Sequence, residues 1–478
     1  MAKFSCENIS DLPHELIVAI ISLLPFIEAY RFCLLRKEWY AKALWLQCTC
    51  LELHDTDFYY TKARQHCLAL GKRVRSMDLK ELGRLRYVHF LDTTIKNLAA
   101  KEISKLSFRL PILTQHHKNI DTWITIAAKK CVKELSLDFS DGDTLEPQPM
   151  QLNQPYVLPN HLYQNAASIR VFSVSSCGLG FCNFSNFVSL KSLSLTRVRI
   201  FWAEVAHLVL SCPLLESLSL VECYRLLKVD ICFNNRRLKT LVVKHCGSLN
   251  MGFELFMPTL EYFEYVGKPV QFVMRNVDAL QEVLLDYRMN PYSRDYNVDD
   301  YRQLFDGFSR PRILKTSTTF LKVFVTDLLL LGQSLYRLMY TQHLLLTTCL
   351  EGYELPAILL LLRSSPLLKT LSIFSTGFTR LLPFQEIMHQ TYPSLPRNIW
   401  TKEGWSFNLL EQVEIDGYVG KKNEIDFLKF IIRNSRSLQI VNLKPWVDSN
   451  MSSPSFSRGL QDIRAEAFLH GDAEINIV

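Results

Sequence analysis

The sequence predicts an α/β solenoid, in which short parallel strands stack and return through helices or irregular segments, with a small helical module before it. Two observations favour this class. Leucine is the commonest residue of the 478, and the hydrophobic (48%) and charged (21%) fractions are those of a folded chain. The second observation is the motif L-x-x-L-x-L, which recurs about every 20–25 residues, a period typical of leucine-rich repeats. Its first six copies begin at Ile169, Leu190, Leu215, Leu238, Leu260 and Leu280.

The motif predicts one short strand in each repeat, because alternate residues of a strand point to opposite faces. The leucines point inward and stack on those of the next repeat, so an array buries a face that one repeat cannot bury alone. We therefore expect a leucine-rich-repeat horseshoe. Later copies begin at Leu368, Leu410 and Leu438, and helices over Phe201–Ser211 and Ala357–Ser364 would return the chain.

Three cysteines support this register. The ninth position of a leucine-rich repeat prefers Asn or Cys, and Cys177, Cys223 and Cys246 stand there. The thirteen cysteines are odd in number and scattered, and no signal peptide precedes them. We interpret them as reduced thiols in a cytoplasmic or nuclear protein.

The residues before the repeats have a helical pattern. Pro25 ends a first helix, a second fits Ile27–Leu35 and a third fits Arg36–Leu46. A module this short cannot bury a sizeable hydrophobic core by itself. It therefore needs to pack against a partner or against the rest of the chain. The apolar residues on one face of the first helix are Leu16, Ile20, Leu23, Leu24 and Ile27.

This opening segment, ISDLPHELIVAIISLLPFIEAYRFCLLRKEWYAKALW, resembles the F-box, the helical module that docks the Skp-type adaptor of cullin ubiquitin ligases. The segments KKCVKELSLDFS, YVLPNHLY and SCPLLESLSLVEC look like the leucine-rich body of plant F-box proteins. The residues from Leu409 to Leu443 resemble the FBD region that often closes such chains. The residues that match the F-box pattern are Leu12, Pro13, Glu15, Leu16, Ile17, Ile20, Leu24, Pro25, Ala29, Arg31, Trp39 and Trp45.

The resemblance implies a substrate-recognition subunit of an SCF-type (Skp–cullin–F-box) ubiquitin ligase, with no cofactor, no metal and no catalytic residues of its own. It would bind a Skp-type adaptor, and through it cullin, with the F-box, and a target protein with the repeats. Its hydrophobic docking face would use aromatic anchors. The expected adaptor-binding residues are Leu12, Pro13, Leu16, Ile20, Leu24, Pro25, Trp39 and Trp45.

One departure from the family pattern leaves an alternative open. Trp39 and Trp45 stand farther apart than is usual in the F-box, and Glu38 precedes the first of them. This spacing indicates a small insertion in the third helix. The alternative is a repeat-based interaction scaffold that has lost its coupling to a ligase, with the same apolar residues serving as a helical core against the repeats.

The second expected surface is the outward face of the repeat strands, because repeat arrays bind partners on such faces. The residues between the inward leucines are small hydroxyls in the earlier repeats, followed by aromatic and charged residues. The expected target-binding residues are Ser192, Ser194, Ser217, Ser219, Thr240, Lys244, Tyr262, Glu264, Glu282 and Asp286.

The predicted organisation runs from an N-terminal module to a C-terminal tail. Residues 8–48 form the F-box module, residues 49–160 irregular N-terminal repeats and a linker, and residues 161–382 the leucine-rich repeats. Residues 383–408 form a loop, residues 409–445 the FBD-like terminal repeats, and residues 446–478 the tail.

The remaining signals argue against other classes. The net charge of +7 is spread along the chain, without the basic stripe that nucleic acid requires, and the apolar stretch Leu16–Ile27 is too short to span a membrane. The glycine motif at Gly178–Asn183 lacks its third glycine, Cys48–Cys67 holds only half of a zinc-ligand pattern, and Asp138–Asp143 resembles a calcium loop loosely. A hydrolase would need a nucleophile elbow, and the sequence has none.

Overall fold

The structure is a computed structural model of a mixed α/β chain, whose contacts divide it into two units, Met1–Arg225 and Leu226–Val478. Each unit contains a parallel sheet with helices. The residues that the structure describes are 12–53, 56–69, 76–111, 116–140, 156–180, 183–226, 229–231, 237–246, 253–268, 270, 272–287, 310–317, 338–348, 350, 354–375, 406–446, 454–470 and 473–478.

The first unit begins with the helical module and continues into parallel strands that follow one another in chain order. The module consists of α1 (His14–Leu23), α2 (Phe26–Cys33), α3 (Lys37–Ala41) and the 3₁₀ helix η2 (Leu44–Gln47). The strands are β1 (Cys50–Leu53), β2 (Lys105–Arg109), β3 (Glu134–Asp138), β4 (Val171–Ser175), β5 (Ser192–Thr196) and β6 (Ser217–Val221). The connecting helices are α4 (Thr56–Ala69), α5 (Ser76–Lys96), α6 (His117–Lys129), α7 (Asn160–Gln164), the 3₁₀ helix η4 (Phe184–Asn186) and α8 (Trp202–Ser211).

The second unit repeats this arrangement. Its parallel strands are β8 (Thr240–Lys244), β10 (Tyr262–Gly267), β12 (Glu282–Tyr287), β13 (Ile313–Ser317), β14 (His343–Thr348), β15 (Thr370–Ser375), β16 (Gln412–Tyr418), β17 (Ile440–Pro445) and β18 (Glu474–Ile477). Its helices are α11 (Leu355–Ser364), α13 (Lys422–Asn434) and α14 (Pro454–His470). A small second sheet is formed by β7 (Val229–Ile231), β9 (Phe253–Phe256) and β11 (Phe272–Arg275), which precede β8, β10 and β12 in the chain.

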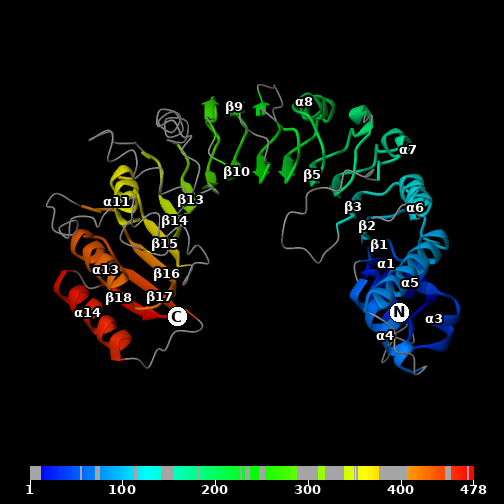
Figure 1. Ribbon diagram of the computed structural model, residues 1–478, viewed down its shortest axis with the longest axis horizontal. Helices are drawn as coiled ribbons and strands as arrows, with labels where there is room; N and C mark the ends of the chain where they lie inside the picture. Colours follow the sequence, from blue (N-terminus) through cyan, green and yellow to red (C-terminus); the bar gives the residue numbers. More distant parts are fainter. Residues whose placement is uncertain are drawn as a thin grey trace, which may run out of the picture. The chain divides into compact units, whose positions relative to one another are not determined.

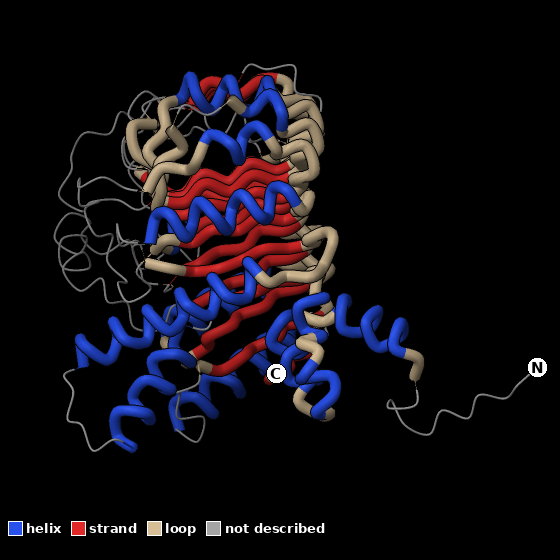
Figure 2. The backbone as a smooth tube through the Cα atoms, turned by 90° about the vertical axis from the view of Figure 1, so that its right-hand side faces the viewer, coloured by secondary structure: helices blue, strands red, loops and turns tan. Residues whose placement is uncertain are grey.

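The helices of each unit lie along one face of its strands. In Figure 1, α6, α7 and α8 lie on one side of β3 to β6, and α11, α13 and α14 lie on one side of β14 to β18. Figure 2 shows the strands stacked one after another, with helices along one side of the stack. The opposite side of each sheet, which we call the open face, carries none of the described helices in these regions. This confirms the predicted leucine-rich-repeat solenoid.

Alternation along the strands separates the core from the open face. In β5 and β6, Leu193, Leu195, Leu218 and Leu220 have no exposed surface, whereas the serines between them are partly exposed. The register sets Leu193 beside Leu218, so the leucines of successive repeats stack on one another. Fully burying one leucine contributes about 1.5–3 kcal/mol. The fold therefore depends on a contact that is renewed in every repeat.

A left-handed residue ends several of the strands. Ser176, Arg197, Glu222 and His245 each follow the last residue of β4, β5, β6 and β8, and each has a φ between 51° and 59°. The turn aims the next residue inward, where Cys177 and Cys223 are fully buried and Cys246 is 6% exposed.

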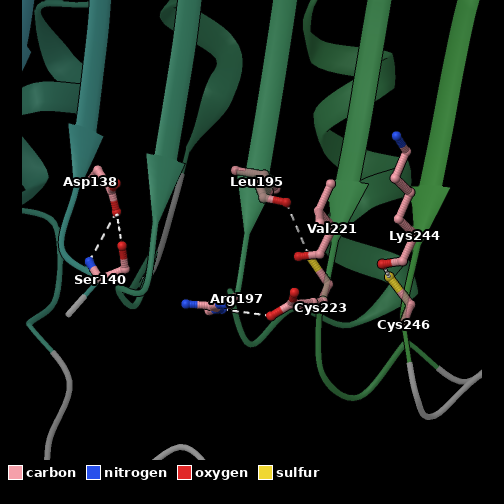
Figure 3. Close-up of polar contacts among 9 residues, drawn as sticks. Asp138, Ser140, Leu195, Arg197, Val221, Cys223, Lys244 and Cys246 are labelled. Carbon is pink, nitrogen blue, oxygen red and sulfur yellow. Dashed lines mark hydrogen bonds and ion pairs between the residues drawn. The ribbon is translucent and has the colours of Figure 1, made fainter. Parts of the chain in front are cut away.

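All three cysteines are small core residues, and two of them, Cys223 and Cys246, also donate hydrogen bonds. Figure 3 shows the thiol of Cys223 directed at the carbonyl of Leu195, 3.4 Å away, and the thiol of Cys246 directed at the carbonyl of Lys244 at 3.5 Å. Burial raises the pKa of the Cys177 thiol to about 12, so it stays protonated. The structure thus confirms the register assigned to these cysteines.

The third helix of the module differs from the prediction of a continuous helix over Arg36–Leu46. Helix α3 ends at Ala41, and Ala43 has a left-handed φ of 48° before η2 begins. The break turns Trp45 back onto Tyr30, with ring centroids 5.3 Å apart, and onto Tyr40 at 5.1 Å. The extra residues between the two tryptophans are accommodated as this kink.

The other predicted elements shift by a few residues. The expected helices over Phe201–Ser211 and Ala357–Ser364 appear as α8 and α11. Residues 141–155 of the expected N-terminal repeats and linker, and the expected loop at 383–408 up to residue 405, lie outside the described residues.

Helices α13 and α14 are clamped by one carboxylate. Arg433 donates to both oxygens of Glu466, through Nε at 2.6 Å and Nη2 at 2.8 Å, and His470 Nε2 lies 3.0 Å from Glu466 Oε1. Glu466 is 6% exposed. The hydrogen bonds from Arg433 outweigh burial and hold the pKa of Glu466 below its ordinary value.

The alternation of faces predicts unequal costs for two neighbouring substitutions in β6. Leu218→Ala should lower the free energy of unfolding by about 2–5 kcal/mol, because it leaves a cavity among stacked leucines. Ser219→Ala, the matched control on the open face, should change it by less than about 0.5 kcal/mol. Chemical denaturation followed by circular dichroism measures both, and equal losses would contradict this assignment of faces.

The Arg433–Glu466 clamp predicts a pH-dependent effect. At pH 7, Glu466→Gln should lower the free energy of unfolding by about 1–3 kcal/mol, since it removes charge-assisted hydrogen bonds. The folded-state pKa of Glu466 is lowered, so its stabilisation is present above the unfolded value of about 4.3 and disappears as the pH falls through the folded value. Thermal melts of both proteins from pH 7 to pH 3 should converge at the acid end. A difference that stays constant across this range would refute the role of the charge.

Candidate functional site: two protein-interaction surfaces

The helical module is fixed directly to the first strand of the repeats. Thr49 Oγ1 donates to the carbonyl of Ser22 at 2.8 Å, and the thiol of Cys48 donates to the carbonyl of Leu24, also at 2.8 Å. Pro25 forms a parallel bridge with Cys50 at the edge of β1. The turn between α1 and α2 is therefore held by the side chains of Cys48 and Thr49, which form the η2–β1 junction.

Cys48 belongs to this junction, where its thiol donates a hydrogen bond. It is fully buried, and its thiol also lies 3.1 Å from the carbonyl of Cys50. Burial raises its pKa to about 11, so the thiol keeps the proton that it donates. Among the described residues no group of three or more His, Cys, Asp or Glu side chains could hold a metal ion.

The two tryptophans expected to contact the adaptor have different positions. Trp39 is only 6% exposed, because its ring stacks on Phe32 with centroids 5.1 Å apart and Arg36 lies 5.5 Å from the ring centroid. Trp45 is partly exposed within the cluster that it forms with Tyr30 and Tyr40. Trp39 therefore packs inside the module, and its expected contact with the adaptor stays a prediction.

The remaining expected adaptor residues lie at or near the surface. Leu16 is 50% exposed, Pro13 and Pro25 are exposed, and the others are partly exposed. Those partly exposed residues are Leu12, Ile20 and Leu24.

Helix α1 carries two apolar stripes. Ile17 and Ile21 are buried against the rest of the module. Leu16, Ile20 and Leu23 follow the spacing of a neighbouring stripe on the same helix, where Leu23 is 83% exposed. A helix that packs on one stripe and leaves a second apolar stripe in water presents a surface for a partner.

Sequence reasoning missed several members of this exposed set. Leu34 is 55% exposed, Leu35 72% and Tyr40 46%. These residues stand next to buried residues such as Cys33 and Trp39 in the sequence. The helical spacing of apolar residues therefore does not show which of them are exposed. We call Leu16, Leu23, Leu34, Leu35 and Tyr40 the apolar module surface.

The open face of the first unit is dominated by small hydroxyl side chains. The register places one serine in each of five neighbouring strands, and these serines form a row across the sheet. Expected residues Ser194 and Ser219 belong to this row, and Ser192 and Ser217 lie in the next row. Short side chains let a partner approach the sheet closely and offer both donors and acceptors. The serines of the row are Ser107, Ser136, Ser173, Ser194 and Ser219.

The sequence pattern identified only the later members of this row. Ser107, Ser136 and Ser173 were not predicted as surface residues. Ser107 lies in a repeat that precedes the first copy of the motif at Ile169, and is 3% exposed. The repeat period before that copy is stretched by α5 and α6, so spacing alone does not align these strands.

The open face of the second unit is charged and largely paired within itself. Lys244 Nζ lies 2.7 Å from Glu264 Oε1, and Tyr262 donates to Glu264 Oε2 at 2.9 Å. Lys315 Nζ lies 2.6 Å from Glu282 Oε1. Of the residues expected to contact a target here, Glu264 is covered by its two partners and is 8% exposed.

The other predicted residues of this face remain partly exposed. They are Thr240, Lys244, Tyr262, Glu282 and Asp286, and Asp286 accepts a hydrogen bond from Ser317. The predicted set of the second unit therefore stands together on one face of neighbouring strands, β8, β10 and β12.

The weak calcium-loop signal at Asp138 has a structural explanation. Asp138 Oδ1 accepts from the backbone N–H and the hydroxyl of Ser140 at 3.0 and 2.7 Å, and Arg109 Nε lies 2.6 Å from Oδ2. Burial acts to raise the pKa of Asp138, but these hydrogen bonds and the charge of Arg109 hold it below its ordinary value. Asp141 and Asp143 lie outside the described residues.

Comparison with known proteins gives relatives along most of the chain. A family model described as "At1g61320/AtMIF1, LRR domain" matches residues 95–459. The Arabidopsis thaliana putative F-box/LRR-repeat protein At1g56400 is 26% identical over 447 residues, which cover 90% of this chain and 87% of the relative.

Two further relatives from Arabidopsis thaliana carry related names. F-box protein At3g62230 is 27% identical over 449 residues, 91% of each chain. FBD-associated F-box protein At1g61320 is 25% identical over 421 residues, which cover 82% of this chain and 86% of the relative. In the described ranges, none of the helices has the length and apolar character needed to cross a bilayer.

Proposed function

Because the chain belongs to the leucine-rich-repeat family whose model is described as "At1g61320/AtMIF1, LRR domain", and its relatives are named F-box/LRR proteins, we propose that it is the substrate-recognition subunit of an SCF-type ubiquitin ligase. In this proposal the module binds a Skp-type adaptor, and through it cullin. The repeats bind a target protein. The chain itself performs no chemistry and contributes proximity, since holding a target near the transfer machinery raises its effective concentration.

One observation carries the adaptor half of the proposal. The apolar module surface leaves large side chains such as Leu23 in water, although the module already has a packed core of its own. Burying exposed apolar side chains at a protein interface is favourable by about 25 cal/mol per Å². A surface of this kind at the end of a repeat array supports docking of a partner that is itself apolar.

The target half rests on the open faces of the repeats. The first unit offers its serine row, and the second unit offers charged residues such as Lys244 and Glu282. We propose that the ten residues expected from the sequence contribute to target binding, with Glu264 acting through Lys244 and Tyr262 because it is buried.

The competing proposal is a repeat-based scaffold that has lost its coupling to a ligase. The break at Ala43 favours it, because the kink alters the part of the module that contains Trp45. The two proposals differ in a single contact, the one between the module and the adaptor.

Substitutions on the exposed stripe of α1 should separate these proposals. The double variant Leu16→Asp, Leu23→Asp should reduce co-purification of the full chain with a Skp-type adaptor at least tenfold, because it places two charges in an apolar contact. The matched control is Leu68→Asp, which alters a 67% exposed leucine of α4 outside the module surface and should leave co-purification unchanged.

Folding and binding are distinguished by the melting temperature of each variant, which should stay within about 2 °C of the unmodified protein, since the changed residues are exposed. If the unmodified chain does not co-purify with the adaptor, the ligase proposal is wrong and the scaffold is favoured. If the double variant and the Leu68→Asp control reduce co-purification with the adaptor equally, the adaptor does not dock on the exposed stripe of α1.

A further inference from the structure

The open face of β15, β16 and β17 is hollowed by a pocket of about 240 Å³. It lies wholly within the second unit and beyond the residues expected to bind a target. Its lining brings together two carboxylates, an aromatic ring, a lysine and two neutral polar groups. These lining residues are Ser372, Phe374, Glu414, Asp416, Asn442 and Lys444.

Glu414 is held in place by neutral donors. Gln412 Nε2 donates to Glu414 Oε1 at 2.6 Å, and the hydroxyl of Ser372 donates to Oε2 at 3.4 Å. The same hydroxyl lies 2.9 Å from His343 Nε2. Burial lowers the pKa of His343, although the charge of Glu414 acts against this effect, so the imidazole is neutral at pH 7. The carboxylate is thus oriented by neutral hydrogen bonds, with no cation among these partners.

The negative charge of Glu414 is not balanced locally. A carboxylate has about four acceptor positions, and these two hydrogen bonds leave further capacity. In the ranges that the structure describes, Glu414 forms no ion pair. The neighbouring charges, Asp416 and Lys444, are 2.9 Å apart and balance each other. Among the side chains that line the pocket, Glu414 is therefore one surplus negative charge in a fixed position.

An exposed aromatic ring lines the same pocket as this charge. Phe374 is 43% exposed on the open face of β15, two residues after Ser372 in the same strand. The register sets Ser372 beside Glu414 and Phe374 beside Asp416. A carboxylate next to an aromatic ring favours a cation that can both accept the charge and lie against the ring.

We propose that this pocket binds an arginine side chain of a partner protein, with the guanidinium donating to Glu414 and lying against Phe374. Arginine fits better than lysine, because its planar guanidinium pairs with carboxylates through two parallel hydrogen bonds, stacks on aromatic rings and is less strongly hydrated. The inference rests on the proposed function in one respect, namely that the partner that carries this arginine is the target of the ligase.

The test uses single-residue probes and the full chain. N-acetyl-arginine methylamide, its neutral isostere N-acetyl-citrulline methylamide and the lysine analogue are titrated by saturation-transfer NMR. The arginine probe should bind at least fivefold more tightly than the citrulline probe, and raised salt should reduce this preference. Equal affinities for arginine and citrulline would overturn the proposal.

Two variants locate the binding. Glu414→Gln keeps a side chain of the same shape and should abolish the preference for arginine over citrulline. Glu411→Gln is the matched control, because it removes a carboxylate next to β16 that is already paired with Lys369 and does not line the pocket, and it should leave the preference within twofold. Phe374→Leu should weaken arginine binding several-fold and affect the lysine probe less. A preference that survives Glu414→Gln would place the binding elsewhere and refute the assignment.

The adaptor assay separates this proposal from the ligase function. Glu414→Gln should co-purify with the adaptor as the unmodified chain does, because the pocket lies outside the module. An arginine preference in a chain that fails to bind the adaptor would retain the pocket and reject the ligase. Adaptor binding without an arginine preference would retain the ligase proposal and reject the arginine pocket.

Discussion

The stacking of inward leucines between successive strands is the contact on which the rest of the structure depends. The side chains of Leu193 and Leu218, for example, pair across neighbouring strands and have no exposed surface, although each strand is only five residues long. One such strand could not form a core, and the helices behind it would have no sheet to cover. Every outward residue, from the serine row to the pocket at Glu414, stands where it does because its neighbours in the strand point inward.

A repeat array also needs its ends covered, because a terminal strand exposes both an apolar face and an edge. At the N-terminal end the module provides this cover, with Phe26 packed edge-to-face on Phe90 at 5.7 Å and Pro25 bridging to β1. At the other end, α14 packs on α13 through the clamp at Glu466. The module thus has two roles in one set of helices, since one side closes the array and another side remains apolar and exposed.

Much of the fold could be predicted from the sequence, because it is encoded by periodic leucines. The strands at Leu193 and Leu218, the helices α8 and α11 and the buried Cys223 all follow from spacing. The left-handed turns could not be predicted in this way, because Arg197 and Glu222 replace the glycine that such a conformation usually requires, at a cost of about 1–2 kcal/mol each. An ion pair between these two side chains, 2.6 Å from Nε to Oε2, offsets part of that cost.

The candidate sites were less accessible to sequence reasoning. Trp39 is of a residue type that is common at protein interfaces. Only the structure shows that Phe32 stacks on its ring and that Arg36 lies over it, which places it in the core. Glu264 occupies an outward position in its strand but is covered by Lys244 of the adjacent strand and by Tyr262 of its own strand. The pocket combines Ser372, Glu414 and Lys444, which are far apart in the chain and become neighbours only through parallel pairing.

The direct fixation of the module to β1 has a geometric consequence for any partner that the module docks. Thr49 and Cys48 hold the α1–α2 turn by hydrogen bonds, so the first strands cannot swing freely about the module. A target bound on the open face of the first unit would then keep a narrow range of distances and directions from the adaptor. Under the proposed function, the lysine that receives ubiquitin would be selected by its place on the surface of the bound target. Targets of different size would then be modified at lysines that stand at different positions in their sequences.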